Sequence, residues 1–192
     1  MAFPAIKSIS PELYLEEERK SSTKHHYFDG EVVAMAGASI AHNTIVSNLI
    51  RETGFFLKGK NCNIFPSDLR VSIPSVTTYT YPDATIICGA PEVTDEQKDT
   101  VKNPSVIFEV LSETTREYDT TRKFMFYQRI PSLKEYILID SIEKSVMVYR
   151  RQENERWEVQ VTEGNEGSLK ISSIDFSLPF NELYSNVLFP TT

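Results

Sequence analysis

The chain has 192 residues and a formal net charge of −7 at pH 7, with 20 Lys and Arg against 27 Asp and Glu. Hydrophobic residues make up 40 % of it and charged residues 24 %, a composition typical of one globular domain with a sizeable core. No stretch approaches the roughly 20 apolar residues of a membrane span, which excludes a membrane-spanning protein. Residues 1–10 lack the basic and apolar regions of a secretory signal, so we expect a cytoplasmic location. The acidic balance argues against non-specific binding of nucleic acid, which requires a basic surface.

The two cysteines, Cys62 and Cys88, are too few for a disulfide framework and lack the spacing of metal ligands. We therefore expect both to be small buried hydrophobic side chains in a reducing compartment.

The first elements are marked by capping and turn residues. Ser10-Pro11-Glu12 supplies a serine cap, a proline in the first turn and an acid near the positive end of a helix over about 11–20. Asp29-Gly30 joins two β-prone runs and predicts a hairpin over 26–33. Apolar residues at helical spacing then predict a helix over 42–58 that ends at Gly59.

The middle of the chain reads as strands with one further helix. Asp119 is expected to cap a helix over 120–129, which Pro131 ends. Four strands are predicted to share one sheet, 69–73, 84–88, 105–111 and 136–140, and the segment 92–102 reads as an exposed connection. A further strand is predicted at 146–149, and the segments 157–161 and 169–174 read as a peripheral antiparallel extension. The order predicts a single α/β (α+β) domain over residues 1–192.

Two acids stand in apolar strands. Asp83 opens the strand 84–88 and Glu109 lies in the middle of 105–111. An unpaired carboxylate in an apolar setting costs several kcal/mol, so it normally protonates, pairs or binds a cation. Alternatively, either acid could lie at a sheet edge or strand end, where contact with water would remove the cost of burial without a bound cation. Together, on neighbouring strands, they form a candidate hard-cation site.

Lys123 lies one helical turn after Asp119, and this spacing allows two interpretations. It fits an exposed (i, i+4) ion pair worth a few tenths of a kcal/mol. It equally allows the ammonium to reach the two carboxylates, where it could orient a water molecule or offset phosphate charge.

The chain resembles the large bacterial family of restriction-endonuclease-like proteins built on the PD-(D/E)XK nuclease fold. The similarity covers about 12–184, and it depends on the order and spacing of motifs rather than on any one of them. These motifs are Tyr27-Phe28-Asp29-Gly30-Glu31, Met35-Ala36-Gly37-Ala38-Ser39 with His42-Asn43, Ser67-Asp68-Leu69-Arg70-Val71, Tyr81-Pro82-Asp83, Phe108-Glu109-Val110-Leu111-Ser112, Asp119 with Lys123 and Tyr127, and 135–140.

The resemblance implies a mixed central sheet flanked by helices and a site for Mg²⁺ (or Mn²⁺) with Asp83 and Glu109 as its ligands. Leu111 stands where the nuclease motif has lysine, and the family's displaced lysine corresponds to Lys123. His26 stands where relatives usually carry glutamate, and Glu31 lies close enough in sequence to replace that acid.

The expected catalytic residues are therefore Asp83, Glu109 and Lys123, with supporting roles for Glu31, His42 and Asp68. His42 could instead make a structural hydrogen bond, and Asp68 could simply face water. His25 and His26 read as surface residues.

The expected function is metal-dependent cleavage of DNA, with DNA as the partner, no membrane contact and a homodimer left open. Two alternatives remain. One is an inactive nuclease fold that binds DNA or protein, and the other is a small-molecule hydrolase with the same metal site.

Overall fold

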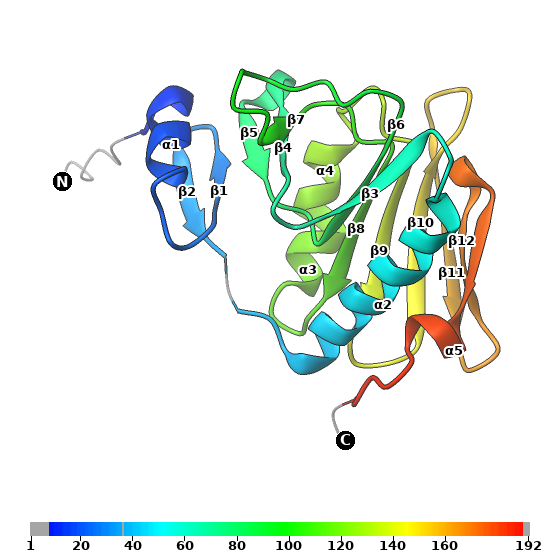
Figure 1. Cartoon of the computed structure of the whole chain (residues 1–192). Helices are drawn as coiled ribbons and strands as arrows, with labels where there is room; N and C mark the ends of the chain where they lie inside the picture. Colours follow the sequence, from blue (N-terminus) through cyan, green and yellow to red (C-terminus); the bar gives the residue numbers. More distant parts are fainter. Residues whose placement is uncertain (1–7, 36, 190–192) are drawn as a thin grey trace.

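The computed structural model describes residues 8–35 and 37–189. Most of the N-terminal segment 1–10, where no secretory signal is predicted, and Ala36 of the Met35–Ser39 motif therefore lie outside the described residues. The strands of the described residues form a six-stranded sheet, a five-stranded sheet and a two-stranded hairpin (Figure 1). Among these residues, no helix is both long and apolar enough to cross a bilayer.

The six-stranded sheet is mixed and forms the centre of the molecule. Its order is β11-β10-β9-β8-β6-β3, with β8 parallel to β9 and every other neighbouring pair antiparallel. The strands are β3 (Cys62–Pro66), β6 (Ala84–Cys88), β8 (Val106–Leu111), β9 (Glu135–Asp140), β10 (Ser145–Arg151) and β11 (Trp157–Glu163). Every residue of β8 and β9 is buried, which explains their nearly continuous apolar sequences.

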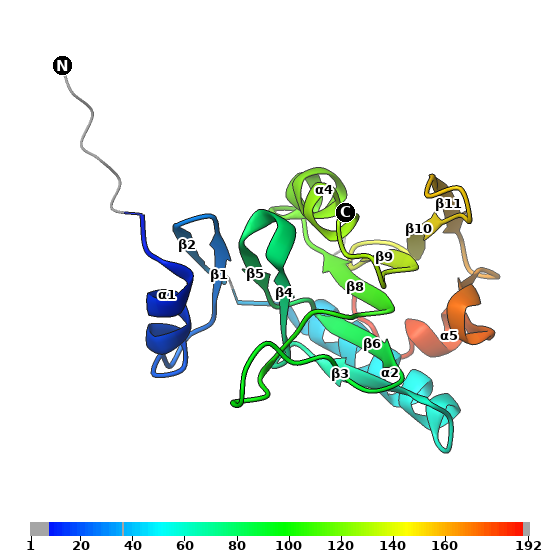
Figure 2. The same ribbon diagram turned by 90° about the horizontal axis from the view of Figure 1, so that it is seen from above.

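Helices cover both faces of this sheet. On one face lies α2 (Ile40–Leu57), and on the other lie α3 (Arg116–Tyr118), a π-helical turn (Asp119–Lys123) and α4 (Phe124–Tyr127). Figure 2 shows the sheet between α2 and α4. The sheet and these helices enclose two hydrophobic cores, one on each face. The fold class is therefore confirmed as mixed α and β.

Asp119 does not cap a helix, because the helical segment already begins at Arg116 and Asp119 lies inside it. Its side chain instead faces a lysine, as described below. Ser39 caps the N-terminal end of α2, because its side chain accepts a hydrogen bond from the backbone nitrogen of His42.

The five-stranded sheet has the order β2-β1-β5-β4-β7. Its strands are β1 (His25–Phe28), β2 (Glu31–Ala34), β4 (Arg70–Ile73), β5 (Thr78–Thr80) and β7 (Thr100–Val101). The predicted hairpin is present, with Asp29 at φ 45° and Gly30 at φ 102° in its turn.

The prediction that 69–73 shares a sheet with the other three strands is wrong. A short 3₁₀ turn, Pro74–Val76, brings the chain back so that β4 pairs with β5, the next strand in the sequence. The other edge of β4 pairs in parallel with β7, which is a buried part of the segment predicted to be an exposed connection. Alternation of polar and apolar residues marks a strand but does not choose its partner.

The ends of the chain add two smaller units. At the N-terminal end, α1 (Pro11–Glu18) packs on β1. At the C-terminal end, β12 (Ser168–Ile171), a 3₁₀ turn (Ser172–Ile174), β13 (Phe176–Pro179) and α5 (Phe180–Leu183) extend the core on the α2 side.

The cysteines are not free hydrophobic side chains. Cys62 and Cys88 lie opposite each other on β3 and β6 and form a disulfide. They are 26 residues apart in sequence, and only the pairing of the two strands brings them together.

Candidate active site

The two acids singled out in apolar strands lie side by side on the sheet. The register of β6 and β8 pairs Ala84 with Phe108, and continuing it by one residue sets Asp83 opposite Glu109. Residues directly opposite in an antiparallel pair point to the same face. For Glu109 this is the face covered by α4, because its carboxylate contacts Tyr127 of that helix.

Glu109 is almost completely buried, with 3 % of its surface exposed. Its Oε1 accepts a hydrogen bond from the Tyr127 hydroxyl at 2.9 Å, and its Oε2 lies 2.9 Å from Lys123 Nζ. The Tyr127 hydroxyl also lies 3.1 Å from Thr80 Oγ1, at the end of β5. Burial raises the pKa of Glu109, and the ammonium of Lys123 opposes that rise.

Lys123 is held between two buried carboxylates. Its Nζ lies 2.9 Å from Glu109 Oε2 and 2.9 Å from Asp119 Oδ1. Burial disfavours its charge, but Glu109 and Asp119 together raise the pKa of Lys123, so the ammonium stays charged. The (i, i+4) ion pair of Lys123 with Asp119 is therefore present, but it is buried and not exposed as the first interpretation required. The same ammonium also contacts Glu109, one of the two carboxylates of the second interpretation.

Asp119 is a member of this cluster that the sequence did not place among the catalytic residues, but gave as a helix cap and as the partner of Lys123 in an exposed ion pair. The π-helical turn carries both Asp119 and Lys123, and Asp119 is 3 % exposed. Its (i, i+4) spacing to a lysine was the available signal, but the spacing does not reveal that the pair is buried.

Asp83 is fixed by donors from two different elements. Its Oδ2 accepts a hydrogen bond from the backbone nitrogen of Val110 at 2.7 Å and lies 3.1 Å from His42 Nε2. Burial alone would raise the pKa of Asp83, but these two hydrogen bonds lower it. His42 comes from the first turn of α2, and its buried Nδ1 has no hydrogen-bond partner among the described residues. In this structure His42 orients the carboxylate of Asp83.

The expectation that His25 and His26 are surface residues is wrong for both. His25 is partly buried against α1, where its Nδ1 lies 2.9 Å from Glu18 Oε2. His26 is also partly buried, and its Nδ1 accepts a hydrogen bond from the backbone nitrogen of Tyr81 at 3.4 Å. Tyr81 is two residues before Asp83, so His26 lies beside the cluster.

The two remaining supporting residues are not brought to the cluster. Asp68 lies in the turn after β3, has a side chain that is 82 % exposed, and pairs with Lys24 at 2.6 Å. Glu31 is exposed on β2, opposite Phe28. Within the described residues neither contacts Asp83, Glu109 or Lys123.

The donor set determines what this arrangement could hold. Asp83 and Glu109 offer two neighbouring carboxylates, and Mg²⁺ is commonly bound by one or two carboxylates together with water and substrate phosphate oxygens. In the described part of the chain no three His, Cys, Asp or Glu side chains come together as a group that could hold a metal ion. An ion held by Asp83 and Glu109 would therefore need water and substrate oxygens for its other ligands.

Comparisons with known proteins extend these observations. Two uncharacterised proteins of Synechocystis sp. (strain PCC 6803) are similar to the chain. One is 34 % identical over 90 % of this chain and 97 % of its own length, and the other is 32 % identical over 94 % of each chain. A crystal structure described as a putative nuclease belonging to DUF820, from Anabaena variabilis, shares the fold with a TM-score of 0.77 at 19 % identity, covering 94 % of this chain and 99 % of that one. Residues 11–181 match the family described as Uma2, putative restriction endonuclease. The chain therefore belongs to the Uma2 family.

Proposed function

We propose that this protein is a metal-dependent endonuclease that hydrolyses phosphodiester bonds of DNA at the cluster of Asp83, Glu109 and Lys123. The observation that carries this proposal is the buried ion pair between Lys123 and Glu109 of β8. Asp83, the residue just before β6, is opposite Glu109 when the register of the two strands is continued by one residue. Membership of a family described as putative restriction endonucleases supports the same class of chemistry.

Hydrolysis of a phosphodiester needs an activated water molecule and positive charge near the phosphate. A Mg²⁺ or Mn²⁺ ion held by Asp83 and Glu109 would polarise a phosphoryl oxygen and lower the pKa of a bound water molecule. The Val110 nitrogen and His42 hold the Asp83 carboxylate in a fixed position. Lys123 supplies a fixed positive charge next to Glu109, where it would align the attacking water or offset charge that develops on the phosphate.

The net charge of −7 opposes the binding of DNA, so part of the negative charge near the cluster has to be offset. Three acids gather at this cluster, and a bound metal ion would offset part of their charge. We expect the affinity for DNA to depend on the divalent ion and to fall with added salt. A homodimer would place two such sites on one duplex, and it remains part of the proposal.

The experiment is cleavage of supercoiled plasmid during a titration with Mg²⁺ or Mn²⁺. We expect nicked or linear product from the wild type and none from Asp83→Asn, which removes a charge without changing the side-chain volume. Asp68→Asn is the matched control, because this aspartate is exposed and pairs with Lys24 instead of with any of the three proposed catalytic residues. Equal cleavage by the wild type and Asp83→Asn would contradict the proposal.

A gel-shift measurement beside the cleavage assay tests the alternative of an inactive DNA-binding module. The observation that favours it is the ion pair between Lys123 and Glu109, which already engages one oxygen of a proposed metal ligand. Such a module would shift a labelled duplex in a gel without cutting it at any ion concentration.

The cytoplasmic location also belongs to this proposal, and the disulfide provides a check on it. Disulfides are rare in cytosolic proteins, where thiols are kept reduced. Alkylation of the freshly extracted protein would report whether Cys62 and Cys88 are paired in the cell.

A further inference from the structure

Alternate residues of β1 face opposite sides of the five-stranded sheet. The side chains of His25 and Tyr27 point toward α1, where His25 meets Glu18 and Tyr27 stacks on Tyr14. The side chains of His26 and Phe28 point the other way, and Phe28 stacks on Phe126 of α4. His26 is therefore on the side of the strand that faces the cluster.

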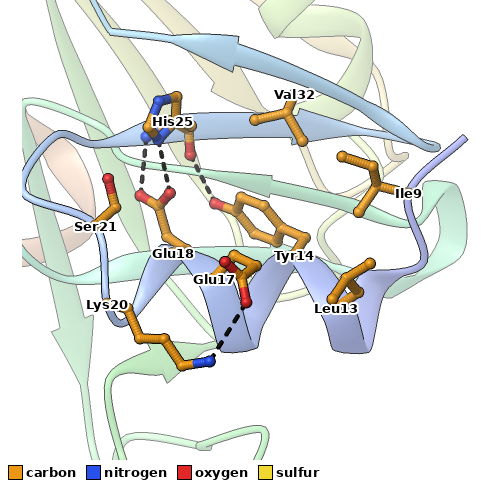
Figure 3. Close-up of a pocket in the computed structure, with 9 residues that line it drawn as sticks. All are labelled: Ile9, Leu13, Tyr14, Glu17, Glu18, Lys20, Ser21, His25 and Val32. Atoms are coloured by element: carbon orange, nitrogen blue, oxygen red, sulfur yellow. Dashed lines mark hydrogen bonds and ion pairs between the residues drawn. The ribbon is translucent and has the colours of Figure 1, made fainter. Parts of the chain in front are cut away.

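The position of His26 is fixed by its neighbour on the strand. In the pocket of Figure 3, Glu18 accepts hydrogen bonds from the backbone nitrogen of His25 at 2.8 Å and lies 2.9 Å from its Nδ1. The Tyr14 hydroxyl donates to the carbonyl oxygen of His25 at 2.6 Å. Because α1 holds both the N–H and the C=O of His25, the backbone position of the next residue, His26, is fixed as well.

The hydrogen bond to His26 determines which ring nitrogen can donate a hydrogen bond to a ligand. Its Nδ1 accepts from the backbone nitrogen of Tyr81, so the proton of the neutral ring is assigned to Nε2. No described residue makes a hydrogen bond with Nε2, and this nitrogen is not among the fully buried atoms without a partner. The ring therefore presents a free N–H donor at the edge of the cluster.

We propose that the Nε2–H of His26 is a phosphate-binding group of this site, donating a hydrogen bond to a non-bridging oxygen of the DNA backbone. The inference deepens the proposed function and rests on it. It does not require His26 to ligate a metal, because Nε2, the ring nitrogen without a partner among the described residues, carries the proton.

The surrounding charges agree with this role. Burial and the ammonium of Lys123 lower the pKa of His26 to about 3, against the opposing effect of Asp83. The ring is therefore neutral at physiological pH. A glutamate at this position would add a fourth acid to Asp83, Glu109 and Asp119 and would repel a phosphate, whereas a neutral donor attracts it.

The test is the affinity of the full-length protein for a labelled duplex oligonucleotide, measured by fluorescence anisotropy in Ca²⁺ and with the oligonucleotide checked for integrity afterwards. His26→Leu removes the donor, and we expect its dissociation constant to rise about tenfold or more, as for the loss of one hydrogen bond to a charged group. His26→Gln keeps a side-chain N–H, and we expect its affinity within about threefold of the wild type. His26→Glu has the size of His26→Gln without the donor, and we expect it to bind more weakly than His26→Leu.

The affinity for Mn²⁺ without DNA, measured by calorimetry on the same variants, provides the second readout. We expect it to be unchanged in His26→Leu and His26→Gln, and a parallel loss of Mn²⁺ affinity would overturn the inference by making His26 a metal ligand. Equal DNA affinity of His26→Gln and His26→Glu would also overturn it, and this comparison remains valid if His26→Leu folds poorly. Absence of DNA binding by the wild type would instead refute the proposed function, and the inference with it.

Discussion

At the scale of single residues, removal of Lys123 is expected to lower both the rate of cleavage and the stability of the fold. Lys123→Met keeps much of the bulk of the side chain and removes the charge. Losing one preorganised electrostatic contact typically costs about 10²–10³ in rate, so we expect plasmid cleavage to fall by that order. Because Glu109 and Asp119 lose the ammonium that both contact, we also expect the free energy of unfolding to fall by about 3 kcal/mol or more.

A second variant separates these two effects. In Lys123→Met with Asp119→Asn, a buried positive and a buried negative charge leave together, so part of the lost stability should return while cleavage stays low. Urea denaturation and the initial rate of plasmid nicking measure the two quantities. Lys134→Met is the control for loss of an exposed lysine. If the double variant cleaves as fast as the wild type, Lys123 has no role in the reaction.

Buried acids in strands are not all candidates for catalysis, and Glu135 of β9 shows the difference. It is 1 % exposed, as buried as Glu109, yet its partners are structural. Its carboxylate accepts hydrogen bonds from the backbone nitrogens of Ser172 and Ser173, from the Ser173 hydroxyl, and from Arg150 Nε at 3.0 Å. Its oxygens are all used in holding neighbouring segments, whereas Asp83 Oδ1 makes no hydrogen bond within the described residues.

At the scale of elements, these contacts predict that Glu135 attaches the C-terminal hairpin to the central sheet. Ser172 and Ser173 form the turn between β12 and β13, so Glu135→Ala leaves their donors without a partner next to β9. We expect the free energy of unfolding to fall by about 2–4 kcal/mol in urea denaturation, and proteolysis at 164–176 to become faster. Glu158→Ala, at an exposed position of β11, should change stability by under about 0.5 kcal/mol. Equal stability of the two variants would show that the hairpin is held by apolar packing alone.

At the scale of the whole molecule, the sequence predicts the type and order of most elements and leaves their partners undetermined. Helical periodicity identified α2, the Asp29-Gly30 turn identified the β1–β2 hairpin, and apolar runs identified the buried strands β8 and β9, because each of these patterns is local. It placed β4 in the wrong sheet and did not foresee the disulfide, because both depend on which strands pair.

The same limit applies to the candidate site. Asp83 and Glu109 were identifiable as acids in apolar strands, and the resemblance to a family drew attention to Lys123. The burial of the Asp119–Lys123 pair and the contact of His26 with Tyr81, which is distant in sequence, are not reported by any local pattern. Asp68 matched a motif but is exposed in a turn, where its carboxylate pairs with Lys24.

Binding of a metal ion by the folded state alone would stabilise the whole molecule. For one site, an ion present at 100 times its dissociation constant adds about 2.7 kcal/mol to the free energy of unfolding. For a chain of this size that corresponds to a rise in melting temperature of roughly 5–10 °C. We expect this rise with Mg²⁺ or Mn²⁺ in the wild type and in Asp68→Asn, but not in Asp83→Asn, which loses one of the two neighbouring carboxylates. Calorimetric scans at constant ionic strength measure it independently of any cleavage. A rise of the same size in Asp83→Asn would show that the ion binds elsewhere, and the assignment of Asp83 as a metal ligand would be wrong.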